Sequence, residues 1–252
     1  MITRKIILSV FFSLSILRLT AQLPAADKIA VTGGELTIQP ITHATLVLNY
    51  HNKLVYVDPT GGAAAFPGLA APDIILITDI HGDHLDTATI MAINTKKATL
   101  VVPQAVADKL TAGIDKQKIV VLKNGETTKL EGLEVMAIPM YNLPEDPSAF
   151  HTKGRGNGYV LTIGGKRIYI SGDTEDIPEM RALKNIDVAF VCMNLPYTMD
   201  PTQAAGGVLA FKPAIVYPYH YGGQDVNTFK KLVNDADKNI DVRLREWYPA
   251  KK

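Results

Sequence analysis

The chain has 252 residues, of which 47% are hydrophobic and 20% charged, and a formal net charge of +1. This length fits one large α/β domain or two small ones, and the composition is ordinary for a globular protein with a buried core. The near-neutral charge argues against nucleic acid as the main partner. Cys192 is the only cysteine, which excludes an intrachain disulfide. Because it ends an apolar run, we expect a buried and inert thiol.

The N-terminal segment has the pattern of a secretory signal. A basic start is followed by an apolar stretch over residues 6–17 and by small residues at 20–22, where cleavage is expected. The stretch is too short for a permanent transmembrane helix. Arg18 is atypical of a leader, and a buried N-terminal element is the alternative. We predict a signal peptide over 1–22, one domain over 23–252, and a periplasmic or secreted protein with no stable membrane insertion after leader removal.

Short β-rich runs separated by turn signals dominate the first half of the mature chain. Their β-branched and apolar residues alternate or cluster as strands require. The run Asp73–Thr78 is apolar between its polar ends, as expected of a strand buried on both faces. We predict strands at 35–39, 45–50, 53–58, 73–78, 100–102 and 119–122, with helices at 86–94, beginning at Asp86 or Thr87, and at 103–112.

The second half repeats this order with variation. Gly164-Gly165 between two β-rich runs is a strong hairpin signal. We predict a hairpin region over 128–130 and 133–139, strands at 158–163, 167–171, 188–192 and 214–217, and helices at 201–210 and 226–237.

No linker or charge block divides the mature chain, which favours a single domain. Strand-rich segments come first in each half, and strand–helix units follow. A pair of mixed sheets packed together and covered by helices fits this order. Periodicity alone does not separate that arrangement from a doubly wound α/β fold.

The segment Thr78–His84 (TDIHGDH) lies where a buried strand ends and a helix is about to begin. Loops in this position often hold active sites. Imidazoles and carboxylates packed this densely suit a cation such as zinc. His81 and His84 are spaced to diverge toward two metals, and Asp83 between them can bind one metal and orient a water. The alternative is a polar loop that caps the following helix.

Three later residues follow the same pattern. Asp173 and His220 each come directly after a predicted strand, and His151 lies in the loop before the glycine-rich segment 153–158. Strand ends on one side of a sheet converge, so these side chains could complete two coordination shells. For His151 the alternatives are a solvent-exposed loop histidine and a competing position at Tyr141-Asn142.

The order of these motifs resembles the metallo-β-lactamase superfamily and, within it, the branch similar to L-ascorbate-6-phosphate lactonase. The resemblance covers essentially the whole mature chain and is specific for the fold but weak for the substrate. It rests on the residues at 42–45 (THAT), 57–59 (VDP), 81–84 (HGDH), 158–159 (GY), 171–174 (SGDT), 197–199 (YTM) and 218–221 (PYHY).

The resemblance implies a four-layer αββα sandwich, two mixed sheets flanked by helices, with a two-metal site. In it, Asp83, His84 and His220 would bind one divalent ion, His81 and His151 the other, and Asp173 would bridge them. Zinc is the favoured metal, with manganese or iron as alternatives. A hydroxide held by the metals would attack the substrate. Asp83 is expected to take part in this step, and His43 to contact substrate or shuttle a proton.

One position departs from the family pattern His-x-His-x-Asp-His, because Asp79 stands where the first histidine is usual. A carboxylate can still ligate, and it would make the site harder and favour manganese, iron or magnesium. The alternative is that Asp79 binds no metal, which would leave one ion weakly bound or absent.

These features predict a metal-dependent hydrolase that cleaves an ester, lactone or phosphodiester bond of a small substrate. The backbone amides of the 153–158 loop, with help from Lys153 or Arg155, could bind an anionic substrate group, or the loop could simply be flexible. Expected aromatic walls are Phe66, Tyr141, Phe150 and Tyr197. The alternative function is a non-catalytic metal- or ligand-binding protein. Nuclease activity is disfavoured by export and charge, and β-lactamase activity by the lactonase resemblance.

Overall fold

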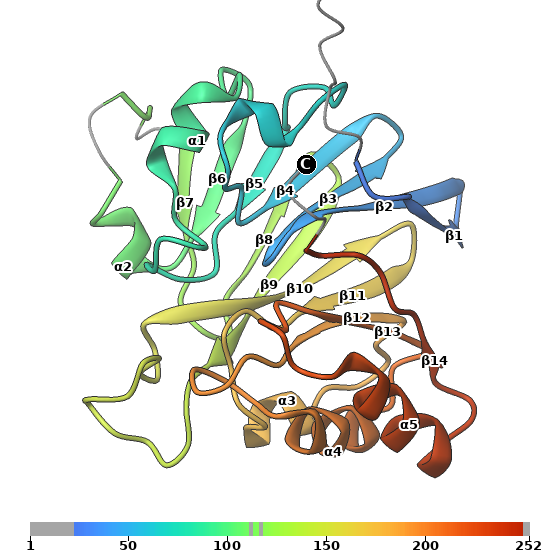
Figure 1. Ribbon diagram of the computed structural model, residues 1–252. Helices are drawn as coiled ribbons and strands as arrows, with labels where there is room; N and C mark the ends of the chain where they lie inside the picture. Colours follow the sequence, from blue (N-terminus) through green and yellow to red (C-terminus); the bar gives the residue numbers. More distant parts are fainter. Residues whose placement is uncertain (1–22, 111–112, 116–117, 249–252) are drawn as a thin grey trace, which may run out of the picture.

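Two seven-stranded sheets are stacked in the computed structural model, which describes residues 23–110, 113–115 and 118–248 (Figure 1). The predicted signal peptide over 1–22 lies outside these residues. The helix expected over 103–112 is shorter than predicted, because it ends at Ala107, and only residues 111–112 of that range are not described.

Strands of the first sheet lie side by side in chain order. The first three pairings, from β1 to β4, are antiparallel, and the three from β4 to β7 are parallel. Its strands are β1 (Asp27–Val31), β2 (Gly34–Thr42), β3 (Thr45–Tyr50), β4 (Lys53–Val57), β5 (Ile74–Leu76), β6 (Thr99–Val102) and β7 (Ile119–Val121).

The second sheet repeats this plan. Three antiparallel pairings from β8 to β11 are followed by three parallel pairings from β11 to β14. Its strands are β8 (Thr127–Leu130), β9 (Leu133–Met140), β10 (Gly156–Ile163), β11 (Lys166–Ile170), β12 (Val188–Cys192), β13 (Ile215–Tyr219) and β14 (Asp241–Val242). The predicted Gly164-Gly165 hairpin joins β10 and β11, and both glycines have positive φ (53° and 77°), which glycine adopts readily.

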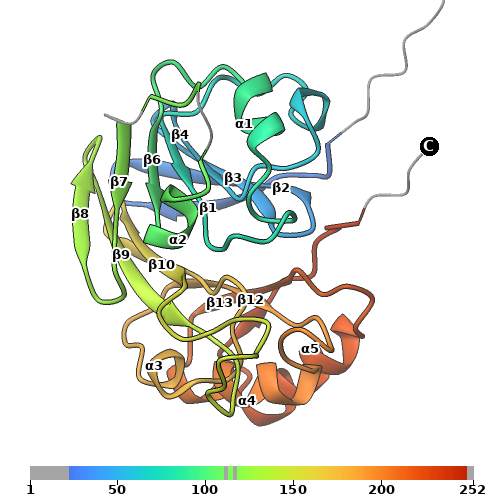
Figure 2. The same ribbon diagram turned by 90° about the vertical axis from the view of Figure 1, so that its left-hand side faces the viewer.

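Helices cover the outer face of each sheet and give four layers, which confirms the predicted αββα sandwich and rules out the doubly wound alternative (Figures 1 and 2). On the first sheet they are η1 (Ala63–Ala65), α1 (Thr87–Ala92) and α2 (Gln104–Ala107), and on the second α3 (Pro178–Arg181), α4 (Pro201–Phe211) and α5 (Val226–Ala236). No helix of the described residues is long and apolar enough to cross a membrane.

The alternation of side chains along β5 explains its continuous apolar run. Ile74 and Leu76 pack in the core between the sheets, whereas Ile75 and Ile77 join a second cluster with Ile90 of α1. Both faces of the strand are therefore buried. The ladder ends at Leu76, two residues earlier than predicted, and the chain continues into the segment that carries the metal-ligand residues.

Candidate metal centre

Asp58 at the end of β4 organises the start of the site. The Thr78 backbone N–H and hydroxyl donate to its two carboxylate oxygens, at 2.8 and 2.6 Å. Asp58 also contacts His84, whose Nδ1 lies 2.8 Å from Asp58 Oδ2. A carboxylate on Nδ1 fixes the ring orientation and the tautomer of a metal-binding histidine and makes Nε2 a better ligand. Asp58 therefore aims His84 Nε2 into the site.

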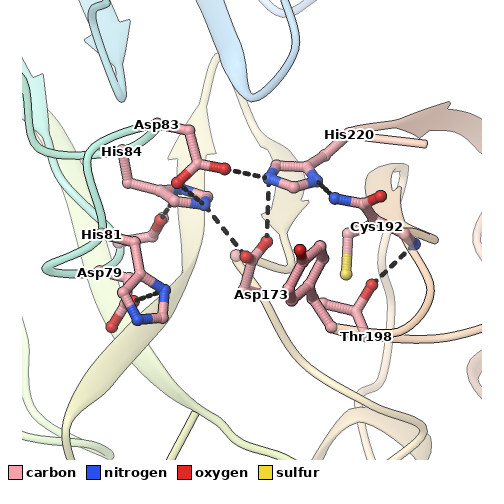
Figure 3. Close-up of polar contacts among 12 residues, drawn as sticks. Asp79, His81, Asp83, His84, Asp173, Cys192, Thr198 and His220 are labelled. Carbon is pink, nitrogen blue, oxygen red and sulfur yellow. Dashed lines mark hydrogen bonds and ion pairs between the residues drawn. The ribbon is translucent and has the colours of Figure 1, made fainter. Parts of the chain in front are cut away.

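Asp173, just after β11, lies at the centre of the site (Figure 3). Its Oδ2 is 3.2 Å from Nε2 of both His84 and His151, and its Oδ1 is 3.4 Å from Nε2 of His220. One buried carboxylate thus touches three imidazoles that come from three different loops. This position between His84 and His151 is the one expected for a residue that bridges two ions.

Two asparagines hold the histidines contributed by the second half. His151 donates its backbone N–H to Asn142 Oδ1 at 2.7 Å, and its Nδ1 lies 3.1 Å from the same oxygen. Asn194 Nδ2 lies 3.3 Å from Nδ1 of His220, which follows β13. In both cases the contact at Nδ1 leaves Nε2 pointing toward Asp173. The structure therefore brings His151 into the site, and Asn142 serves as its support.

The Asp83 side of the site is open to solvent. The Asp83 side chain is 42% exposed, and its Oδ2 lies 3.3 Å from His220 Nε2 and 3.0 Å from His43 Nε2. His43 Nδ1 is in turn 2.6 Å from the Tyr248 hydroxyl. His43 therefore reaches the site through Asp83 and is itself oriented from the C-terminal segment.

Four buried polar atoms in the site have no hydrogen-bond partner among the described residues: Nε2 of His84, His151 and His220, and Oδ1 of Asp173. Each histidine nitrogen lies within 3.4 Å of an Asp173 oxygen, but the geometry is not that of a hydrogen bond. An unpartnered buried polar atom is costly, and four of them at one point require an explanation. Nitrogen and oxygen atoms that converge in this way are the donors that a divalent transition metal takes.

The charges of the cluster also suit a cation. Burial opposes ionisation of Asp173, but His220 and His84 hold the pKa of its carboxyl well below the usual range. Burial also disfavours charge on His84, but Asp173 and Asp58 raise its pKa well above the usual value. Asp173 therefore remains ionised and attracts positive charge. Residues Asp83, His84, Asp173 and His220 place ligand atoms within 4.8 Å of one another.

A second group of potential ligands comprises Asp79, His81 and His151. Asp79 is fully buried, and Arg155 donates to both of its oxygens, from Nε at 3.1 Å and from Nη2 at 2.8 Å. His81 Nδ1 also lies 3.0 Å from Asp79 Oδ2. The structure thus gathers every residue that the sequence predicted for the metal site, but Asp79 has a protein cation as its partner. Ligation by each of them stays a prediction.

Three residues of the site have left-handed backbone conformations, which are uncommon outside glycine. The φ angles are 51° for His43, 43° for Asp58 and 47° for His220. The His220 N–H also donates to the His43 carbonyl at 3.2 Å, which links two of these strained positions. Such outliers concentrate at functional sites.

Sequence reasoning missed the residues that orient the ligands: Asp58, Asn142, Asn194, Arg155 as the partner of Asp79, and Tyr248. Asp58 had a signal, because it belongs to the Val57-Asp58-Pro59 motif. Cys192 is buried as predicted, and burial raises the pKa of its thiol to about 12, so it is inert.

A buried set of histidines and carboxylates at the strand ends of an αββα sandwich is typical of metal-binding enzymes with the metallo-β-lactamase fold. Residues 55–221 match the family model described as beta-lactamase superfamily domain. The chain belongs to this superfamily and, within it, to the UPF0173 metal-dependent hydrolases.

Individual relatives agree with this placement. A UPF0173 metal-dependent hydrolase of Thermococcus onnurineus is 32% identical over 77% of this chain and 91% of its own. A crystal structure of a protein from Parabacteroides distasonis, named as a metal-dependent hydrolase, is 41% identical, with a TM-score of 0.81 over 89% of this chain and 100% of its own. The metallo-β-lactamase fold protein YhfI of Bacillus subtilis, 11% identical, has a TM-score of 0.65 over 81% of this chain and 88% of its own and shows the fold alone. The narrower resemblance to L-ascorbate-6-phosphate lactonase is not confirmed and stays a prediction.

Proposed function

We propose that this chain hydrolyses an ester, lactone or phosphodiester bond of a small molecule, with a divalent metal ion held by Asp83, His84, Asp173 and His220. The observation that carries the proposal is the convergence of unpartnered, buried ligand atoms in a pocket that contains two carboxylates. The set of two imidazoles and two carboxylates fits zinc, which we propose as the metal, and also manganese or iron.

A divalent ion in this pocket would acidify a coordinated water and stabilise the negative charge that develops on a carbonyl or phosphoryl oxygen. The chain's own residues supply orientation. Asp58 and Asn194 fix the rings of His84 and His220, and His43 fixes the Asp83 carboxylate. His43 is partly exposed and also contacts the Tyr248 hydroxyl, so it can hold a proton between Asp83 and the solvent side.

An apolar rim, made of exposed side chains, lies beside residues of the site in sequence. Phe150, next to His151, is 50% exposed and contacts Tyr197, which is 44% exposed, with ring centroids 4.9 Å apart. Leu143 and Leu195 are also exposed. This rim supports a substrate with an apolar portion. Phe66 and Tyr141, the other two aromatic residues expected to line the site, are buried. Phe66 stacks on Tyr56, and the Tyr141 hydroxyl donates to Glu179.

The cations of the 153–158 loop do not support the expected anion site. Lys153 is paired with Glu145 and Glu179, and Arg155 with Asp79. The proposal therefore requires no anionic group on the substrate. We still propose that the substrate is a small molecule and that the protein is exported, to the periplasm or beyond.

The Asp79–Arg155 ion pair is the observation that favours the second candidate, a non-catalytic metal- or ligand-binding protein. A pair that removes one ligand from the second group could leave a site that binds without turnover. Both candidates predict bound metal, so turnover separates them.

The test is to measure bound metal by elemental analysis and to assay aryl ester, lactone and aryl phosphodiester substrates with the same preparation. We expect turnover that a chelator abolishes and that His84→Ala removes. His51→Ala is the matched control, because His51 is an exposed turn histidine remote from the ligands in the chain, and it should leave both readouts unchanged. Bound metal without turnover on any of the three substrate classes would favour the binding protein.

A further inference from the structure

Two equally buried carboxylates of the centre differ in their partners. Asp173 is 3% exposed and keeps an unpartnered oxygen, whereas Asp79 is 0% exposed and has both oxygens bonded. Asp173 can therefore still bind a cation, whereas both oxygens of Asp79 are already bound to a cation, the Arg155 guanidinium. The guanidinium Nη2 also lies 3.5 Å from His81 Nε2, so Arg155 contacts two of the three potential ligands of the second group.

We infer that the protein binds a single metal ion, in the Asp83, His84, Asp173 and His220 pocket, and that the Arg155 guanidinium takes the place of a second ion. This inference rests on the proposed function for the identity of the first site, but it concerns the number of ions rather than the reaction. It replaces the two-ion expectation from the sequence.

Charge is the first reason. The pKa of arginine is high enough that the guanidinium stays protonated, and its planar shape matches a carboxylate at two points. Arg155 therefore neutralises Asp79 and would repel a dication placed among Asp79, His81 and His151. The first pocket, in contrast, contains the two carboxylates of Asp83 and Asp173. A divalent ion is attracted to the first pocket and excluded from the second.

The position of Arg155 is fixed by the fold and is not the accident of a mobile side chain. The next strand, β10, begins at Gly156, and the Asn157 N–H donates to the Thr78 carbonyl at 2.9 Å, directly before Asp79. A Cβ at Gly156 would come within 2.8 Å of the same Thr78 oxygen, so glycine permits this close approach. The two sheets therefore meet where Arg155 meets Asp79, and the Arg155 side chain is only 19% exposed.

The remaining ligand of the second group is His151, whose Nε2 is unpartnered and lies 3.2 Å from Asp173 Oδ2. Both ring nitrogens of His81 are already engaged, Nδ1 with Asp79 Oδ2 at 3.0 Å and Nε2 with Arg155 Nη2 at 3.5 Å. The His151 imidazole and an oxygen of Asp173, which the first ion also needs, are too few donors for a second ion, since protein-bound zinc takes three or four protein ligands. With one ion bound, His151 stays next to Asp173 and positions its Oδ2, the oxygen that His84 Nε2 also contacts.

The experiment measures metal stoichiometry of the purified protein after reconstitution with excess Zn²⁺ and removal of free ion. We expect one ion per chain in the wild type and in His81→Ala, and less than a tenth of an ion in His84→Ala. Arg155→Met, which keeps an unbranched side chain but removes the guanidinium and its charge, should approach two ions per chain, and Asp79→His with Arg155→Met should reach two. Circular dichroism checks that each variant is folded.

Titration with Co²⁺ gives a second readout, because its visible absorption should saturate at one equivalent in the wild type and continue to two in Arg155→Met. Two ions in the wild type, one of them lost in His81→Ala, would overturn the inference and leave the hydrolase proposal standing. An Arg155→Met protein that is folded and holds one ion would also overturn it. One ion without turnover would support the inference and count against the hydrolase.

Discussion

The two halves of the molecule share one plan and divide the metal centre unequally. Strands β1–β7 and β8–β14 follow the same order, with three antiparallel pairings and then three parallel ones. The first half concentrates its ligands in the loop after β5. The second half offers one ligand at a time, Asp173 after β11 and His220 after β13, with His151 in the long loop after β9. The shared strand order therefore determines after which strands the metal-ligand residues can lie. It does not determine how many ligands one loop contains.

Ligand removal is the strongest test of this division, because both halves are required if the ion lies between them. His84→Ala in the first half and His220→Ala in the second should each abolish bound metal and activity, since each leaves the site one neutral nitrogen donor short. Elemental analysis and the ester assay measure the effect. Retention of a full ion in either variant would show that the centre belongs to the other half alone.

The cores of the two halves offer a second contrast. Phe190 on β12 stacks on Tyr217 with centroids 5.0 Å apart and also meets Trp247 at 6.3 Å, whereas the corresponding strand β5 carries Leu76. We expect Phe190→Ala to lower the free energy of unfolding by about 3–5 kcal/mol and Leu76→Ala by about 2–5 kcal/mol. Urea denaturation measures both.

Met91→Ala is the control for these core variants, because Met91 is exposed, and it should stay within about 0.5 kcal/mol of the wild type. A loss below about 1 kcal/mol for Phe190→Ala would mean that the aromatic cluster does not contribute the packing described.

The supports behind the ligands also differ between the halves, a carboxylate behind His84 and an amide behind His220. Removal of such a partner costs about 10- to 100-fold in metal affinity. Asp58→Asn should lie near the upper end, because it removes a charge that is buried beside His84, and Asn194→Ala near the lower end. Competition with a chromogenic chelator measures the affinities. Equal affinities in Asp58→Asn and wild type would contradict the assigned support.

The smallest effect is expected where the halves are joined, at Asp27 of β1. Burial opposes its ionisation, but the Tyr217 hydroxyl at 2.6 Å and the nearby Arg243 and Arg245 lower its pKa below the usual value. Because the folded pKa is the lower one, the stabilisation is present above the unfolded pKa of about 3.9 and is lost as the pH falls through the folded pKa.

Asp27→Asn should therefore reduce the free energy of unfolding by about 1 kcal/mol at pH 7, with a smaller deficit below pH 3. Urea denaturation at both pH values measures this. A deficit that is unchanged with pH would assign the effect to packing and not to charge.

The sequence predicted the elements whose signals are local. The buried strand β5 has a continuous apolar run, and α4 and α5 begin at the predicted residues, Pro201 and Val226, each capped by the aspartate before it. Strands β1 and β14 and helix α3, which contain five, two and four residues, escaped prediction. Two or four residues are too few to show a period. Strand β1 is as long as β4, but its sequence DKIAV has fewer β-branched and aromatic residues than KLVYV.

The candidate site was predictable to the same extent. The ligands after β5 are contiguous, and Asp173 and His220 follow clear strands, so their types and places were visible. The supports were not, because a lone Asn194 or Arg155 carries no signal until the chain brings it to His220, 26 residues away, or to Asp79, 76 residues away. The first contact depends on the pairing of β12 with β13, and the second on the stacking of the two sheets.

The left-handed backbone at His43, Asp58 and His220 has a consequence for the history of the chain. Each of these conformations costs about 1–2 kcal/mol in a residue other than glycine. Selection for stability alone would replace such residues with glycine or asparagine, and selection for chemistry retains them. Stability and activity therefore compete at positions 43, 58 and 220, and relatives that have lost the chemistry should be the first to carry glycine or asparagine there.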